Sequence, residues 1–283
     1  MHDVTPVLSI DYLVIGHVSK DLTPEGSALG GTAAYSGLTA HALGLRVGVV
    51  TSTGADLDLS PLAGLAIQRL PSPSSTTFEN RYGGAGREQF LHARAQELGP
   101  SSVPSLWRSA RIVHLGPIAG EVDTDLVDFF PAALLGVTPQ GWMRSWDGQG
   151  RVFPSPLPEK ERILAAAGAV VISLEDVSGD ESAIEELAEL TRLLVVTDAG
   201  NGARVYWNRD QRRVPAPHVP EVDPTGSGDI FAAAFFSRLY QTRDPWEAAR
   251  FANILASTSV TRRGIAATPT PAEVDAAGLQ VIP

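Results

Sequence analysis

The sequence predicts an α/β fold with a mostly parallel central sheet and helices on both faces. One observation is a series of short, nearly continuous apolar runs rich in Val, Ile and Leu, which are typical of strands buried on both faces. The other is that Ala-rich helical stretches separate these runs, as in repeated βαβ units. Since ligands of such sheets bind beyond the carboxyl ends of the strands, site residues are expected in the loops that follow the strands.

The predicted elements alternate along the chain. Strands are expected at residues 12–15, 47–50, 112–115, 170–172 and 194–196, and helices at residues 32–43, 159–167, 181–193, 230–240 and 246–260. No linker or change of composition divides residues 1–283, so one domain is expected. Residues 76–92 interrupt the pattern with two polar strands around a Gly-rich turn. They form either a surface hairpin or a lid across a site.

Composition restricts the class of partner. The 283 residues carry 22 Lys and Arg against 32 Asp and Glu, a formal charge of −10, which disfavours nucleic acid and anionic membranes. There is no cysteine, so disulfides and thiolate ligands are excluded. Residues 1–10 do not resemble a signal peptide, and the longest apolar stretch, residues 163–174, is too short to span a bilayer. A cytoplasmic protein is expected.

The strongest functional signal is the stretch Asp223-Pro-Thr225-Gly226-Ser227-Gly228-Asp229, which opens a helix of small and apolar residues. Its glycines allow a tight turn, and the helix N-terminus adds partial positive charge, so the backbone of residues 226–228 can hold a phosphoryl group. Asp229, in the first turn, can take a proton from an attacking hydroxyl. The alternative is a plain turn with a helix-start Asp.

This stretch resembles the late signature of the ribokinase, or PfkB, family of carbohydrate kinases. The resemblance implies a ribokinase-like α/β fold with a small, reduced β lid, and a kinase that uses ATP and Mg²⁺, with a monovalent cation as an open addition. It makes Asp229 the catalytic base and the backbone of Gly226, Ser227 and Gly228 the anion hole.

Weaker motifs extend the resemblance over nearly the whole chain. The residues expected to bind the substrate are Asp21, Gly30, Gly31, Tyr35, Gln140 and Arg144, and those expected to bind the nucleotide are Thr197, Gly200, Gly202, Thr225 and Asn253. Either Glu175 or Asp176 is expected to serve Mg²⁺. Tyr35 stands where the family often has a sugar-binding Asn, and the Gln140 to Arg144 stretch resembles a subgroup that includes inositol kinases.

The segment between Gly16 and Gly30 is shorter than in ribokinase, so the hairpin at residues 76–92 is expected to be the main cover of the site. In the family such lids also join subunits, which implies a homodimer. The predicted function is ATP-dependent phosphorylation of a hydroxyl group on a small sugar, an inositol-like polyol or a related metabolite. The alternatives are a nucleoside kinase of the same family and a sensor that binds ligands without turnover. A dinucleotide-dependent oxidoreductase is disfavoured, because no G-x-G-x-x-G joins the first strand to the first helix.

Overall fold

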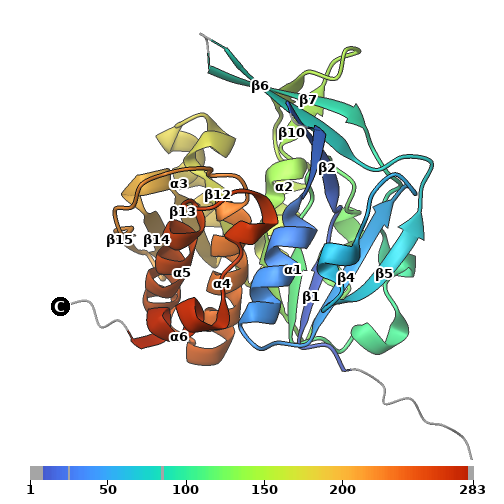
Figure 1. Ribbon diagram of the computed structural model, residues 1–283. Helices are drawn as coiled ribbons and strands as arrows, with labels where there is room; N and C mark the ends of the chain where they lie inside the picture. The colour runs from blue at the N-terminus through green and yellow to red at the C-terminus, as the bar shows by residue number, and fades with distance from the viewer. Residues whose placement is uncertain (1–8, 25, 84–85, 280–283) are drawn as a thin grey trace, which may run out of the picture.

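A nine-stranded sheet forms the centre of the protein in a computed structural model that describes residues 9–24, 26–83 and 86–279 (Figure 1). Its strand order is β15-β14-β13-β12-β9-β8-β1-β4-β5. The strands are β1 (Tyr12–Ile15), β4 (Val47–Thr53), β5 (Ala66–Pro71), β8 (Ile112–Leu115), β9 (Leu134–Val137), β12 (Ala169–Ser173), β13 (Leu193–Thr197), β14 (Ala203–Trp207) and β15 (Asp210–Val214). Only the β13–β14 and β14–β15 pairs are antiparallel, so the predicted mostly parallel sheet is confirmed.

Helices cover both faces of this sheet. One face packs against α1 (Thr32–Ala42), α4 (Ser227–Thr242) and α5 (Pro245–Ser259), and the other against α2 (Lys160–Ala166) and α3 (Glu181–Leu190). Helix α6 (Pro271–Leu279) packs on α5. Alternate residues of a strand point to opposite faces. In β1, Tyr12 and Val14 accordingly join the first core, while Leu13 and Ile15 join the second.

The elements predicted from apolar runs are present, with ends that differ by a few residues. The helix expected to start at Ile230 begins at Ser227, because the glycine turn leads straight into the helix. The helix expected to reach Leu193 ends at Leu190, and the last residues of that prediction start β13. Strands β5 and β9 were not predicted, and neither were β14 and β15. The last two form an antiparallel hairpin at the sheet edge, where β15 is largely exposed and has no continuous apolar run.

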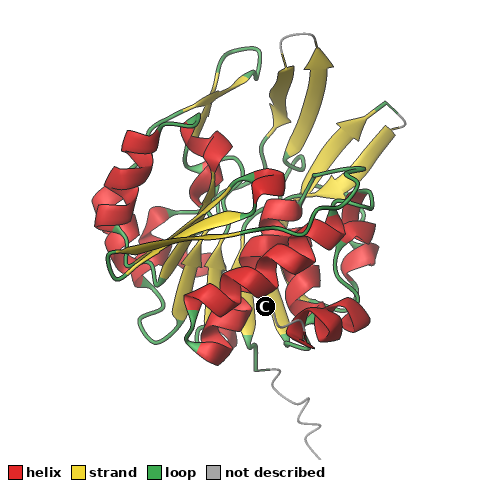
Figure 2. Ribbon diagram, turned by 90° about the vertical axis from the view of Figure 1, so that its left-hand side faces the viewer, coloured by secondary structure: helices red, strands yellow, loops and turns green. Residues whose placement is uncertain are grey.

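A four-stranded sheet, ordered β3-β2-β6-β7, forms the lid over one end of the central sheet (Figures 1 and 2). Its strands are β2 (Ser19–Thr23), β3 (Gly26–Gly30), β6 (Thr77–Gly83) and β7 (Gly86–Ala93). The predicted hairpin at residues 76–92 is therefore only half of the lid, and the expectation that it is the main cover is corrected. Its turn, residues 84–85, lies outside the described residues.

A further hairpin, β10 (Arg144–Trp146) and β11 (Val152–Pro154), extends the lid. The backbone N–H of Leu91 in β7 donates to the carbonyl of Gly150 at 2.7 Å, which joins this hairpin to the lid sheet. The cover of the site thus has three parts, from residues 19–30, 77–93 and 144–154. No helix within the described ranges is long and apolar enough to cross a membrane.

Candidate active site

A cleft of ≈ 1140 Å³ lies between the lid and the carboxyl ends of the central strands. Every residue predicted for the site lines this cleft except Gly30. The predicted residues that line the cleft are Asp21, Gly31, Tyr35, Gln140, Arg144, Glu175, Asp176, Thr197, Gly200, Gly202, Thr225, Gly226, Ser227, Gly228, Asp229 and Asn253. Parallel strands bring their carboxyl ends to one edge of the sheet, so residues far apart in the sequence meet there.

Asp229 is held in place by helix α1. Its Oδ1 atom accepts a hydrogen bond from the Thr32 hydroxyl at 2.6 Å, and its backbone carbonyl accepts one from the Ser36 hydroxyl at 3.0 Å. Asp229 keeps part of its surface exposed to the cleft, so a substrate hydroxyl can reach it. The carboxylate is therefore oriented by a fixed donor on one oxygen.

Burial raises the pKa of Asp229 to about 6. The Thr32 hydrogen bond and the Arg144 guanidinium lower this pKa, whereas the carboxylates of Asp21 and Asp176 raise it. A carboxyl group with a pKa near 6 is a stronger base than an ordinary Asp and is still mostly ionised at neutral pH. These are the properties needed to accept a proton from an alcohol.

The loop before α4 is shaped for close approach to an anion. Gly226 has φ +81°, and a Cβ atom there would lie 2.5 Å from the ring of Tyr35. The carboxylate of Asp223 accepts hydrogen bonds from the backbone N–H groups of Thr225 at 3.0 Å and Gly264 at 3.4 Å, which fixes the start of the loop. The first N–H groups of a helix have no partner within the helix and carry partial positive charge. The loop and helix can thus bind a phosphoryl group.

Tyr35 is almost completely buried, with 2% of its surface exposed. Its ring packs beneath Gly226, and burial raises the pKa of its hydroxyl well above the usual value, so it stays neutral. This placement gives Tyr35 a role that the sequence did not reveal, as the support of the anion-binding loop.

Asp21 lies on β2 and lines the cleft together with Asp229. Its Oδ1 atom accepts a hydrogen bond from the Ser19 hydroxyl at 2.8 Å. A Cβ atom on Gly30 would lie 2.1 Å from the Asp21 carboxylate, and one on Gly31 would lie 2.4 Å from the His17 carbonyl. Gly30 does not line the cleft, but its missing side chain leaves room for Asp21.

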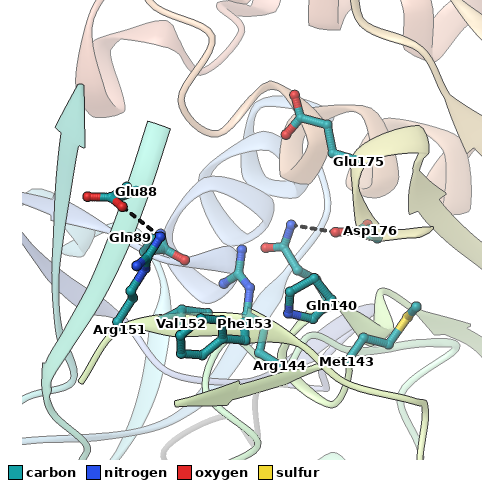
Figure 3. Close-up of a pocket in the computed structure, with 11 residues that line it drawn as sticks. Glu88, Gln89, Gln140, Met143, Arg144, Arg151, Val152, Phe153, Glu175 and Asp176 are labelled. Atoms are coloured by element: carbon teal, nitrogen blue, oxygen red, sulfur yellow. Dashed lines mark hydrogen bonds and ion pairs between the residues drawn. The ribbon is translucent and has the colours of Figure 1, made fainter. Parts of the chain in front are cut away.

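The carboxylates of Asp176 and Glu175 differ in the hydrogen bonds that they accept (Figure 3). Asp176 accepts hydrogen bonds from the Ser173 backbone N–H at 2.7 Å and from the Gln140 amide at 3.0 Å, so it caps the turn after β12. Glu175 is exposed and has no hydrogen-bond donor among the described residues. Mg²⁺ usually keeps several waters and needs one or two protein carboxylates, so this pair fits the ion. Glu175 is the carboxylate more free to approach it.

The far end of the cleft is formed by α5 and the loop after β15. Asn253 is buried, and its amide donates to the carbonyl of Val214 at 2.8 Å, tying this loop to α5. Thr197 ends β13, and Gly202 has φ +91° in the following loop. Apolar side chains of Ala216, Pro217, Val219, Ala256 and Val260 line the same end. This surface can hold a flat apolar ring.

Several lining residues were missed from the sequence. Thr32, which binds Asp229, reads as an ordinary helix start. Asn80 and Gln89 face the cleft from paired positions of β6 and β7, and the amide of Gln89 donates to the Asn80 carbonyl oxygen at 3.1 Å. The signal for Asn80 was its position two residues after Phe78 on the strand, since residues two apart share a face, and Gln89 pairs with Asn80.

Thr138 also lines the cleft, and a chain of hydrogen bonds connects it to the buried side chains of His114 and Tyr12. Thr138 Oγ1 is bonded to His114 Nε2 at 2.9 Å, and His114 Nδ1 to the Tyr12 hydroxyl at 2.9 Å. Burial lowers the pKa of His114 to about 3, so its ring is neutral and serves to position Thr138.

Comparisons with known proteins point to one family. Residues 162–273 match the sequence model of the pfkB family carbohydrate kinases. A cytidine kinase of Thermococcus kodakarensis is 28% identical over 255 residues, covering 81% of this chain and 88% of that protein. An inositol 3-kinase of Oryza sativa subsp. japonica is 27% identical, covering 90% of this chain and 70% of that protein.

Solved structures agree in fold. A pyrophosphate-dependent kinase in the ribokinase family, complexed with a pyrophosphate analog and myo-inositol, superposes with a TM-score of 0.79 at 22% identity, over 94% of this chain and 99% of that chain. The matched sequence region contains both the Asp223–Asp229 stretch and the helix after it. The resemblance predicted from the sequence is confirmed: residues 162–273 match the model of the pfkB family carbohydrate kinases, and the fold is shared with a solved kinase of the ribokinase family.

Proposed function

We propose that this protein transfers the γ-phosphoryl group of ATP, in the presence of Mg²⁺, to a hydroxyl group of a small uncharged sugar, polyol or related metabolite. The observation that carries this proposal is the Asp229 carboxylate, oriented by Thr32 at 2.6 Å beside the glycine loop at the start of α4. A base and an anion-binding helix N-terminus in one cleft are what phosphoryl transfer to an alcohol requires.

In this mechanism Asp21 and the lid hold the acceptor, and Asp229 takes the proton of the attacking hydroxyl. The backbone N–H groups of Gly226, Ser227 and Gly228 hold the transferred phosphoryl group. Glu175, with Asp176 behind it, would hold Mg²⁺, which neutralises charge on the phosphates when bound. Positioning and electrostatic stabilisation supply most of the acceleration, since phosphoryl transfer needs little covalent help from a protein.

The charge of the cleft supports an uncharged acceptor. Carboxylates of Asp21, Asp176 and Asp229 face it, and Arg144 is the only Lys or Arg among the described lining residues. An acceptor that already carries a phosphate group would meet this excess of negative charge. Free sugars, inositols and nucleosides would not.

The apolar end of the cleft supports a nucleotide as donor, because the adenine ring would lie against Ala256 and Val260. The test is ADP release from MgATP with a panel of unphosphorylated sugars, inositols and nucleosides, with Asp229→Asn protein as the control. Pyrophosphate replaces ATP in a parallel series. Turnover with pyrophosphate alone would refute the donor assignment, and ATP binding without transfer to any acceptor would favour a sensor.

A further inference from the structure

A line of three hydrogen-bonded side chains runs across neighbouring strands of the central sheet and ends at the cleft. The Tyr12 hydroxyl of β1 is bonded to His114 Nδ1 of β8 at 2.9 Å, and His114 Nε2 is bonded to the hydroxyl of Thr138, which follows β9, at 2.9 Å. Tyr12 and His114 are fully buried, whereas Thr138 is half-buried and lines the cleft. The mechanism proposed above uses none of the three.

The ring of His114 is held in one orientation. The ring of Phe236, from α4, packs edge-on against it with 5.1 Å between the ring centres, and the Tyr12 ring packs edge-on at 6.2 Å. Phe236 in turn lies against Gly136 of β9, where a Cβ atom would be 2.6 Å from its ring. Close packing on these sides keeps each ring nitrogen of His114 directed at its own partner.

Burial fixes which atoms of this line carry a proton. It raises the pKa of the Tyr12 hydroxyl well above its usual value and lowers the pKa of His114 to about 3, so Tyr12 keeps its proton and the His114 ring carries one. His114 Nδ1 is the only partner of the Tyr12 hydroxyl among the described residues, and a buried hydroxyl hydrogen without an acceptor is costly. Tyr12 therefore donates to Nδ1, the ring proton is on Nε2, and this N–H donates to Thr138.

The hydroxyl hydrogen of Thr138 is left for a ligand. Thr138 Oγ1 accepts from His114, and its own hydrogen has no acceptor within the part of the chain that the structure describes. A Cβ atom on Gly116 would lie 2.4 Å from Thr32 Cγ2 and 3.4 Å from Thr138 Oγ1, so Thr138 is close to the residue that orients Asp229. The result is a hydrogen-bond donor that faces the cleft near the base.

This donor complements the acceptors around it. The ionised carboxylates of Asp21, Asp176 and Asp229 line the same cleft and can only accept hydrogen bonds. A substrate hydroxyl that donates to one of them keeps lone pairs that need a donor. Thr138 supplies such a donor without adding charge.

We propose that Thr138 donates a hydrogen bond to the substrate hydroxyl beside the one that is phosphorylated, and that Tyr12 and His114 are positioning residues that keep Thr138 a donor. This role rests on the proposed function and adds an acceptor-binding residue to it. The reacting hydroxyl itself is not the target, because a donor on its oxygen would make that oxygen a poorer nucleophile.

The first test separates binding of the acceptor from the chemical step. The acceptor probes are myo-inositol, D-ribose and cytidine, with MgATP as the donor. Thr138→Val removes one hydrogen bond, so it is expected to raise the acceptor KM by roughly 3–10-fold and to leave kcat and the KM for ATP within about 2-fold of wild type. Thr138→Ser is expected to restore the acceptor KM. A loss of kcat with an unchanged acceptor KM would mean that Thr138 acts on the phosphoryl group, and it would overturn the proposal.

The matched control for Thr138→Val is Thr191→Val. Thr191 is buried outside the cleft, and its hydroxyl donates to the Leu187 carbonyl at 2.6 Å. This variant loses a threonine hydroxyl of the same kind and is expected to keep the wild-type acceptor KM. Urea unfolding shows whether each variant is folded.

Deoxy analogues of the best probe locate the oxygen that Thr138 binds. Removal of the hydroxyl beside the reacting one is expected to raise the KM less in Thr138→Val than in wild-type protein, because both changes remove the same hydrogen bond. Fully additive effects of the two changes would overturn the assignment.

The second test reads the proton order from the ¹⁵N NMR signals of the histidine rings, since a ring nitrogen with a proton differs in chemical shift from one without. His114→Gln identifies the His114 signals. The wild-type ring is expected to carry its proton on Nε2 at neutral pH, and Tyr12→Phe is expected to give a mixture of tautomers and a smaller increase of the acceptor KM than Thr138→Val. A proton on Nδ1 in the wild-type protein, or an unchanged tautomer in Tyr12→Phe, would overturn the positioning roles.

Calorimetry with the three acceptor probes separates this proposal from the proposed function. Binding to Asp229→Asn protein that weakens when Thr138→Val is added supports the role of Thr138 even if no probe is phosphorylated, in which case the kinase proposal alone fails. Phosphorylation of a probe with an acceptor KM that Thr138→Val does not change overturns the role of Thr138 and leaves the kinase standing. Absence of binding by every probe also overturns it.

Discussion

The substitution Thr32→Val isolates the contact that orients the base. The Thr32 hydroxyl donates to Asp229 Oδ1 at 2.6 Å, and Thr32 is buried, with 4% of its surface exposed. Valine keeps the shape of threonine and removes the donor. Since the hydrogen bond favours the ionised carboxylate, its loss is expected to raise the pKa of Asp229 further.

The size of this shift follows from the kind of bond. A hydrogen bond to a charged group contributes about 1.5–3 kcal/mol, and each pKa unit corresponds to about 1.4 kcal/mol. The pKa of Asp229, about 6 in the native protein, is therefore expected to rise by roughly 1–2 units in Thr32→Val. At pH 6 the base would then be mostly protonated, whereas at pH 9 it would be mostly ionised.

The assay is the pH profile of kcat/KM from pH 5 to 10, which reports the essential base of the free enzyme. The acidic limb is expected to move to higher pH in Thr32→Val and to return in Thr32→Ser, which restores a hydroxyl. Urea unfolding at each pH confirms that the variants are folded. An equal loss of activity at every pH, with the limb unmoved, would show that Thr32 acts only through packing and would refute the reasoning.

Three further substitutions test the rest of the site. Asp229→Asn is expected to lower turnover by about 10²–10⁴-fold. It is also expected to raise the free energy of unfolding at pH 8 by up to about 3 kcal/mol. The reason is that folding raises the pKa of Asp229 from 3.8 to about 6, so ionisation of Asp229 costs the native protein stability as the pH rises. Urea unfolding should show this gain disappearing below about pH 4, and a gain that persists there would contradict the assignment. Gly226→Ala is expected to destabilise the fold by at least about 1–2 kcal/mol, since the backbone of Gly226 has the left-handed conformation. An unchanged midpoint of thermal unfolding would contradict this prediction. Glu175→Gln should raise the Mg²⁺ concentration needed for half-maximal activity without changing stability, whereas Asp176→Asn should lose about 0.5–2 kcal/mol of capping energy; equal effects of the two on Mg²⁺ dependence would contradict their separate roles.

Five strands of the central sheet could be predicted from the sequence because the evidence for each of them is local. The run Tyr12–Ile15 is apolar at every position, and all four of its residues are buried in β1. The Asp223–Asp229 stretch is equally local, since the glycine turn and the helix that it opens are contiguous. Neither inference requires knowledge of which distant segments meet.

The β2–β3 half of the lid and the support of the base could not be predicted in this way. Strand β2 pairs with β6 through Lys20 and Thr77, but β2 is short and largely polar, so no apolar period marks it. Thr32 meets Asp229 across 197 residues of sequence. Such contacts depend on how α1 packs against α4, which a threonine at a helix start does not reveal.

The charges around Asp229 couple its basicity to the loading of the site. Asp21 and Asp176 both raise the pKa of Asp229, and only Arg144 and the Thr32 hydroxyl oppose them. A cation held beside Glu175 and Asp176 would offset one source of this repulsion, because opposite charge favours the ionised carboxylate. The base is therefore expected to be fully ionised in the loaded enzyme at a pH where the free enzyme is partly protonated. The acidic limb of the pH profile of kcat should accordingly lie at lower pH than the acidic limb of kcat/KM. Raising the Mg²⁺ concentration should shift the acidic limb of kcat/KM toward that of kcat. Coincident limbs at all Mg²⁺ concentrations would mean that the metal does not act on Asp229 through the carboxylates of this cleft.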